Sequence, residues 1–465
     1  MEMQKTRDEI DSQYKWRLED IFETNALWEE AAEAAERQIT EIRKYSGKFV
    51  KNAAAMAECL EKLYDLNGLV TKLYVYAYMR RDEDSANSFY QDLAGKADLI
   101  VTKFSAAISF FEPELLTLNK DKITKFMKKE PALKEYAFII EEIMRKKAHV
   151  LSKAEEKLLA MAGEATSAGR DVFLMFNNAD IKFPVITDEN GNKVELTNGR
   201  YSKFMESPDR NTRKRAFKAL YDTYGAYRNT LAAAYAGNVK TDKFYAEAQK
   251  YSSCLVAALY QDNVPSTVYN GLIQTVHANI KKLTPYLELR KKMLGVRKLH
   301  MYDLYVPFVK IPQKTYSFEE ARGIVIEALK PLGEEYGEVL KTAFTDGWID
   351  VHENKGKRTG AYSWGCYGCH PYVLLNWQGT INDVFTLAHE LGHAMHTYYS
   401  NEAQPLQYAE YKIFVAEVAS TVNENLLMEY LLQNTKDDAE KAFLLNHYLE
   451  EFRATVFRQT MFAEF

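Results

Sequence analysis

The chain has 465 residues, of which 60 are basic and 65 are acidic, and its net charge is −5 at pH 7. The basic residues form no block, which argues against nucleic acid as a main partner. No apolar run approaches the roughly 18 residues that a membrane-spanning helix needs, and the charged first residues do not resemble a signal peptide. We therefore expect a cytoplasmic protein that binds neither nucleic acid nor membrane. The sequence does not indicate an oligomeric state.

Helices dominate the elements predicted for the first part of the chain. Residues 1–112 contain no proline, and stretches such as residues 60–70 keep the apolar spacing that is typical of helices. The first breaks come at Pro113 and Pro131. The pattern predicts an array of antiparallel helices.

The pattern changes at residues 181–197. Short runs with strand character flank a turn sequence at residues 188–192, which contains Asn-Gly. Asn-Gly between two such runs predicts a β-hairpin. We place a boundary here, between an N-terminal helical region at residues 1–185 and a second region at residues 186–465.

Strand signals return at residues 347–377, and a pair of cysteines lies among them. Cys366 and Cys369, followed by His370, match the haem-attachment pattern C-x-x-C-H. Attachment through that motif needs an exported chain, which the sequence does not indicate. A zinc site at this pair would need two more ligands, and none is evident nearby. Free thiols in a loop are the simplest interpretation, and a redox-sensitive pair is the alternative.

The most informative motif follows at residues 389–393, which read His-Glu-x-x-His. Residues four apart share one face of a helix, so His389 and His393 can bind one ion while Glu390 lies beside it. The surrounding residues are apolar nearly all round, so we expect a largely buried helix, with Thr380 or Asn382 as its N-cap. Buried polar groups are costly without partners, and a zinc ion is the natural partner. The alternative is a surface helix with two solvated histidines.

A catalytic zinc ion needs a third protein ligand and an open position for water. Three glutamates lie downstream at intervals of seven residues: Glu410, Glu417 and Glu424. Glu417 is favoured because it lies in an apolar helical stretch, where a carboxylate needs a counter-charge. Glu424 is a weaker candidate, for an acceptor that orients a ligating histidine. The alternative for Glu417 is an ordinary helix carboxylate, exposed or paired with Lys412.

Several motifs together resemble the oligoendopeptidase F family, whose members are relatives of thimet oligopeptidase. The similarity extends over most of the chain, at residues 178–180, 199–202, 348–351, 360–363, 371–377, 389–396 and 414–421. The resemblance implies a cytoplasmic zinc metalloendopeptidase that cleaves short oligopeptides. It assigns His389, His393 and Glu417 as the ligands of one zinc ion and Glu390 as the catalytic carboxylate.

The expected fold is mainly α. It is a multi-helix zinc-peptidase fold with a deep cleft, an active-site helix that carries the motif, and a small β-sheet or hairpin. Residues 186–465 then form the catalytic region, and an edge strand near residues 360–363 would pair with the backbone of an extended peptide.

The resemblance also implies a difference from the family at the C-terminus. Family members continue past the position of Phe465 with a segment rich in histidine and tyrosine, which binds the substrate carbonyl and stabilises the oxyanion. We therefore expect a C-terminally incomplete catalytic region. This leaves an alternative function, a catalytically impaired, truncated protein that holds zinc and binds peptides.

Overall fold

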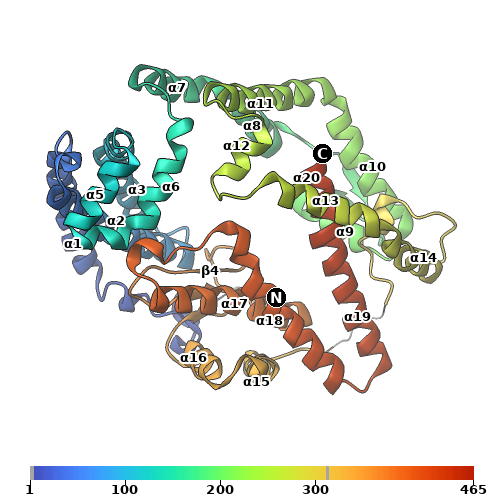
Figure 1. Ribbon diagram of the computed structural model, residues 1–465. Helices are drawn as coiled ribbons and strands as arrows, with labels where there is room; N and C mark the ends of the chain where they lie inside the picture. The colour runs from blue at the N-terminus through green and yellow to red at the C-terminus, as the bar shows by residue number, and fades with distance from the viewer. Residues whose placement is uncertain (1–4, 310–313) are drawn as a thin grey trace. The chain divides into compact units, whose positions relative to one another are not determined.

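Helices make up most of residues 5–309 and 314–465, the part of the chain that the computed structural model describes (Figure 1). The packing of the chain defines two units. Unit 1 consists of Met1–Lys147 and Gln313–Asn434, and unit 2 consists of Ala148–Pro312 and Thr435–Phe465. The boundary expected between residues 185 and 186 falls within unit 2 and stays a prediction.

The first part of unit 1 is a group of helices in which α2 (Ala53–Glu83) packs against α1 (Asn25–Ile42) and α3 (Ser88–Ile108). The side chains of Thr24, Asn52 and Asn87 cap these three helices by accepting hydrogen bonds from backbone amides of the first turn. Trp28 is fully buried, and its indole nitrogen donates to the carbonyl of Leu73 at 2.9 Å. The helical character predicted for this part is confirmed. The helices are α1 Asn25–Ile42, α2 Ala53–Glu83, α3 Ser88–Ile108, α4 Phe111–Leu115, α5 Lys120–Lys129 and α6 Ala137–Arg145.

The second part of unit 1 contains a sheet of three short strands, in the segment where the sequence predicted strands. They are β3 Ile349–Asp350, β4 Tyr362–Trp364 and β5 Tyr372–Leu374. The order in the sheet is β3-β5-β4, with β5 parallel to β3 and antiparallel to β4. All three residues of β5 are buried. Strand β4 therefore lies at an edge, where one row of backbone groups has no partner within the sheet.

Two helices of unit 1 precede this sheet in the chain and two follow it: α15 Phe318–Ala328 and α16 Glu334–Thr345 come before β3, and α17 Ile381–Ala403 and α18 Ile413–Asn434 come after β5. Helix α17 packs against β4, β5 and α18. Its N-cap is Thr380, which exchanges hydrogen bonds with Asp383 in a capping box. Val384, Leu387 and Leu391 are fully buried. The sequence therefore correctly predicted a largely buried helix, and of the two N-cap candidates it is Thr380 that serves.

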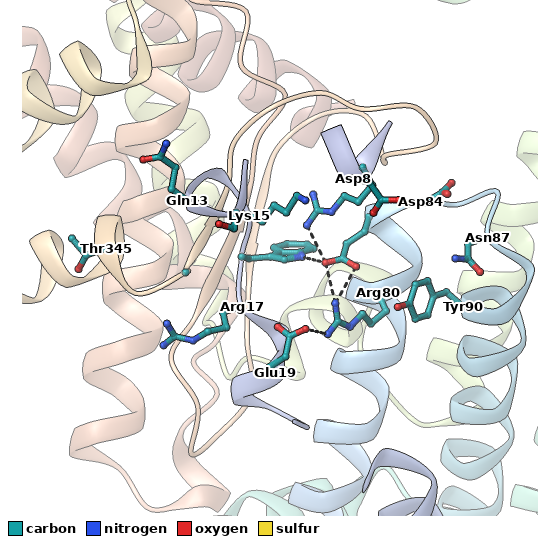
Figure 2. Close-up of a pocket in the computed structure, with 15 residues that line it drawn as sticks. Asp8, Gln13, Lys15, Arg17, Glu19, Arg80, Asp84, Asn87, Tyr90 and Thr345 are labelled. Carbon is teal, nitrogen blue, oxygen red and sulfur yellow. Dashed lines mark hydrogen bonds and ion pairs between the residues drawn. The ribbon is translucent and has the colours of Figure 1, made fainter. Parts of the chain in front are cut away.

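Buried charges join the N-terminal segment of unit 1 to this sheet. Asp350, at the end of β3, is 1% exposed and forms ion pairs with Arg7 and with Lys357, whose Nζ lies 2.6 Å from Oδ1. Glu83, at the end of α2, pairs with Arg7 at 3.0 Å and with Arg80 at 3.3 Å. A cavity of about 660 Å³ lies beside this network and is lined by several of the same side chains, among them Arg80 (Figure 2). Because the network pairs these charges with one another, they hold the fold together and do not mark an active site.

Unit 2 contains the hairpin that the sequence predicted. Strand β1 Val185–Thr187 pairs antiparallel with β2 Lys193–Glu195, and Gly191 in the turn has a φ of 85°. The hairpin contributes Ile186 to a core that also contains Phe183, Leu196, Phe204, Met205, Ala216, Leu220 and Tyr302. The helices of unit 2 are α7 Lys153–Thr166, α8 Ala168–Met175, α9 Asn198–Glu206, α10 Arg210–Ala226, α11 Arg228–Ala248, α12 Cys254–Tyr260, α13 Ser266–Asn279, α14 Thr284–Met293, α19 Asp438–Phe452 and α20 Arg458–Glu464.

The mainly helical fold with small β elements is thus confirmed, and the deep cleft stays a prediction. A membrane-spanning helix would have to be both long and strongly apolar, and the described residues contain none of that kind.

Candidate active site

Two helices of unit 1 bring the predicted metal ligands together. His389 and His393 lie on α17, and Glu417 lies on α18. The helices approach closely at Gly392, where an added Cβ would come 2.5 Å from the Cα of Ser420. Only glycine fits this contact, because any side chain would push α18 away. Gly392 thus sets the distance at which Glu417 faces the two histidines.

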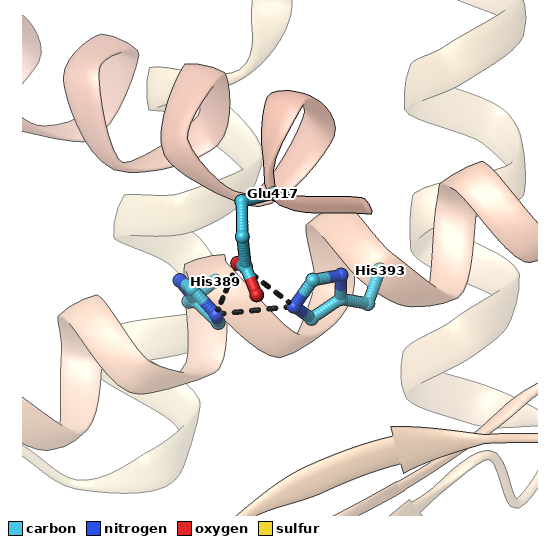
Figure 3. A group of neighbouring side chains, drawn as sticks. All are labelled: His389, His393 and Glu417. Atoms are coloured by element: carbon cyan, nitrogen blue, oxygen red, sulfur yellow. Dashed lines mark hydrogen bonds and ion pairs between the residues drawn. The ribbon is translucent and has the colours of Figure 1, made fainter. Parts of the chain in front are cut away.

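The three side chains form a compact triangle of possible metal ligands (Figure 3). The Nε2 atoms of His389 and His393 are 3.1 Å apart, and Oε2 of Glu417 lies 3.4 and 3.3 Å from them. A tetrahedral ion with bonds of about 2.0 to 2.1 Å separates its ligand atoms by about 3.3 to 3.4 Å. The spacing of the three atoms therefore fits one metal ion just outside their plane. In the part of the chain that the structure describes, this group has three members, which leaves a fourth position of a tetrahedral ion open.

The ring of His389 is held in place by a hydrogen bond on the side away from the triangle. Its Nδ1 lies 2.9 Å from Oε1 of Glu424. A carboxylate can only accept hydrogen bonds. In neutral His389 the proton therefore resides on Nδ1, and the lone pair of Nε2 is available to bind a metal ion. Glu424 thus has the contact expected of an acceptor that orients a ligating histidine.

Glu390 is far more enclosed than the residues of the triangle. Glu390 is 8% exposed, and its carboxylate accepts a hydrogen bond from the backbone amide of Ser363 in β4. Burial raises the pKa of Glu390 to about 7, and the charge of Glu417 acts in the same direction. A carboxylate with a pKa near neutrality is suited to accept and return a proton.

One reason given for choosing Glu417 is wrong, although its position beside the histidines agrees with the choice. Its side chain is 66% exposed, and the apolar neighbours Ile413, Phe414 and Val418 are exposed as well. Glu417 is therefore not a carboxylate buried among apolar side chains. What distinguishes it is that α18 points it at two imidazoles. Glu410 lies before the first residue of α18, so the three glutamates do not share one helix.

Strand β4 and the connection that follows it contain two further features, the backbone amide of Ser363 and the cysteine pair. The contact from Ser363 was not predicted, because a backbone amide leaves no signature in the sequence beyond its place in a strand. Cys366 and Cys369 lie in the connection between β4 and β5 and do not belong to the triangle.

Comparison with known proteins agrees with this site. Residues 203–465, more than half of the chain, match the sequence pattern of peptidase family M3, and residues 114–183 match that described as Oligopeptidase F. The chain is 46% identical over 459 residues to oligopeptidase PepF of Bacillus subtilis, covering 99% of this chain and 68% of that protein. It is 42% identical to an oligoendopeptidase F homologue of Lactococcus lactis, covering 100% of this chain and 77% of the relative.

Solved structures give the same result. A peptidase structure from Chlamydophila abortus superimposes with a TM-score of 0.90 at 35% identity, covering 99% of this chain and 78% of that one. Oligoendopeptidase F from Enterococcus faecium superimposes with a TM-score of 0.69 at 37% identity, covering 95% of this chain and 74% of that one. The chain therefore belongs to peptidase family M3, and within it to the metallopeptidases of the oligopeptidase F type. The family resemblance seen in the sequence is confirmed, while the expectation about residues beyond Phe465 stays a prediction.

Proposed function

We propose that the protein is a zinc-dependent endopeptidase that hydrolyses short oligopeptides, with His389, His393 and Glu417 holding one zinc ion and Glu390 acting as general base. The observation that carries this proposal is the triangle of donor atoms, with sides of 3.1 to 3.4 Å. Two imidazole nitrogens and one carboxylate oxygen form a donor set typical of catalytic zinc, and such sites keep one position open. The names of the relatives, oligopeptidase and oligoendopeptidase, support the choice of substrate.

A zinc ion bound at this triangle would acidify a water molecule and polarise the scissile carbonyl. The remaining chemistry falls to residues of this chain. Glu390 accepts the proton of the attacking water and then delivers it to the nitrogen of the leaving amine. The amide of Ser363 holds the Glu390 carboxylate in place during both transfers. Burial raises the pKa of Glu390, which favours uptake of the proton by its carboxylate.

Strand β4 offers a way to hold the substrate. It lies at the edge of its sheet, and Ser363, at its centre, also contacts Glu390. An extended peptide that pairs with β4 would be bound through its backbone, with affinity for many sequences. The scissile bond would then lie beside the carboxylate that moves its proton.

We also propose a cytoplasmic location. All four cysteines are free thiols. Stable disulfides are rare in the cytoplasm, so this state is the one expected there.

Metal removal and restoration test the proposed function. The protein is treated with 1,10-phenanthroline, freed of the chelator by dialysis, and incubated with a mixed library of short peptides before and after addition of zinc. Cleavage should disappear with the metal and return at about one zinc per chain. A chain that binds one zinc ion but cleaves no peptide would instead support the alternative of a peptide-binding protein. Cleavage that survives complete metal removal would refute the zinc mechanism.

A further inference from the structure

Outside the metal centre, the connection between β4 and β5 contains a turn that brings two cysteines together. The backbone amide of Cys369 donates to the carbonyl of Cys366 at 3.3 Å, and Gly368 has a φ of 79°. A four-residue turn closed in this way, with glycine at its third position, is a type II turn. Its first and fourth Cα atoms lie within about 7 Å, and disulfides join Cα atoms about 4.4 to 6.8 Å apart. The turn thus brings the two Cα atoms to about the separation that a disulfide spans.

The two thiols differ in their surroundings as a redox-active pair requires. Cys366 is buried, and Cys369 is partly exposed. The neighbouring Cys366 thiol and the cation Lys72 hold the pKa of Cys369 below its usual range, against the opposing effects of burial and of the Asp20 charge. The Cys369 thiol also donates a hydrogen bond to the backbone carbonyl of Asp20 at 3.6 Å. Cys369 is therefore placed to attack a small disulfide first, as a thiolate. Cys366 is then placed to attack the mixed disulfide that forms on Cys369.

A metal site at the same pair is not supported. His370 follows Cys369, but its Nε2 lies 2.9 Å from Oδ2 of Asp20 and its ring stacks on Trp348. Among the residues described, the pair belongs to no group of three or more metal-binding side chains. Two thiolates alone do not complete a zinc site. The remaining chemistry that needs two adjacent thiols is disulfide formation.

We propose that Cys366 and Cys369 form a reversible dithiol–disulfide couple that exchanges with low-molecular-weight disulfides. The Cys369 thiolate attacks one sulfur of the small disulfide, forms a mixed disulfide and releases one small thiolate. The Cys366 thiol then loses its proton to solvent and attacks the Cys369 sulfur, which releases the second small thiolate. The pair gives up two electrons and two protons, and the small disulfide becomes two thiols.

Oxidation of the folded protein by glutathione disulfide tests the couple, with intact mass and peptide mapping as the readouts. All proteins carry Cys254→Ser, because Cys254 is exposed and would form its own adduct. Cys59 needs no substitution, because burial raises the pKa of its thiol to about 12. The parent, which carries Cys254→Ser alone, should form the Cys366–Cys369 disulfide, and its mass should fall by that of two hydrogen atoms. Excess reduced glutathione should return it to the dithiol.

Two single variants separate the roles of the thiols. Cys366→Ser should stop at the mixed disulfide, so that the glutathione adduct on Cys369 rises about tenfold or more over the parent. Cys369→Ser should leave Cys366 unmodified in the folded state.

A parent that keeps both thiols in glutathione disulfide, while the same chain unfolded in guanidinium forms the disulfide, would overturn the proposal. So would equal adduct formation at Cys366 and Cys369 in the two variants. The parent's result stands even if one variant fails to fold, and none of these measurements depends on peptidase activity.

Discussion

Unit 1 holds two clusters of charged and polar side chains that differ in how their groups are paired. Around Asp350, each carboxylate meets cations of the chain itself, from Arg7, Arg80 and Lys357. Around Glu417, the lone pairs of two imidazoles and a carboxylate converge on one point. The first cluster is closed and completes the fold. The second gathers electron donors at the spacing of metal ligands, so the cation that it needs comes from outside.

Burial of charge alone does not mark a functional site in this protein. Asp350 is 1% exposed, whereas the side chain of Glu417 is 66% exposed. A ranking by burial would therefore choose the structural cluster. The direction of the lone pairs and the presence or absence of partners distinguish the two clusters.

The largest effect is expected from Glu390→Gln, which tests whether the second cluster is catalytic. Because Glu390 accepts a proton and is not a proposed ligand, the variant should keep its zinc while turnover falls about 10² to 10⁴-fold. Zinc content and peptide cleavage are measured on the same sample. Glu402→Gln, at an exposed position of the same helix, is the matched control and should leave both unchanged. Loss of zinc from Glu390→Gln would show that its role is wrongly assigned.

Asp350→Asn tests the structural cluster. It leaves the buried Lys357 without its carboxylate and removes one of the two carboxylates that pair with Arg7, so the free energy of unfolding should fall by about 3 to 5 kcal/mol. The exposed pair of Glu41 and Lys44 provides the control Glu41→Gln, which should cost about 0 to 1 kcal/mol. Denaturant unfolding measures both.

The pH dependence of stability gives the same cluster a second test. The cations beside Asp350 hold its pKa below the usual range despite its burial. A lowered pKa contributes stability above the unfolded-state pKa, and this contribution is lost as the pH falls through the folded-state pKa. The parent should therefore lose stability on acidification more steeply than Asp350→Asn. Equal slopes would show that Asp350 does not contribute through its charge.

Glu417→Ala and Glu410→Ala test which glutamate completes the metal site. Removal of a direct ligand should weaken zinc binding more than the roughly 10- to 100-fold that removal of an orienting partner costs. Glu410 precedes α18, so its variant should bind zinc as the parent does. Competition with a chelator of known affinity measures both. The assignment fails if Glu410→Ala loses the metal and Glu417→Ala keeps it.

Glu424→Ala is expected to have the smallest effect of these changes. It removes the acceptor at Nδ1 of His389 and leaves the three ligands in place, so zinc affinity should fall about 10- to 100-fold. Glu424→Gln keeps an acceptor oxygen and should retain more affinity than the alanine variant. Unchanged affinity in Glu424→Ala would mean that the hydrogen bond does not orient the ring.

The sequence predicted the features that depend on local spacing. His389 and His393 are one helical turn apart, and the Asn-Gly hairpin is equally local. Features that depend on distant contacts were missed or misjudged. Asp350 forms an ion pair with Arg7, which lies near the start of the chain. Ser363 contacts Glu390 through its backbone amide. The exposure of Glu417 depends on what packs over α18, which a helical pattern does not reveal.

The zinc site is tested most directly by a crystal structure of the zinc-loaded protein with anomalous data at the zinc edge. We predict one anomalous peak per chain, bonded at about 2.0 to 2.2 Å to Nε2 of His389, Nε2 of His393 and a carboxylate oxygen of Glu417. A peak bound elsewhere, such as at Cys366 and Cys369, with none among these three side chains, would show that His389, His393 and Glu417 do not hold the zinc ion.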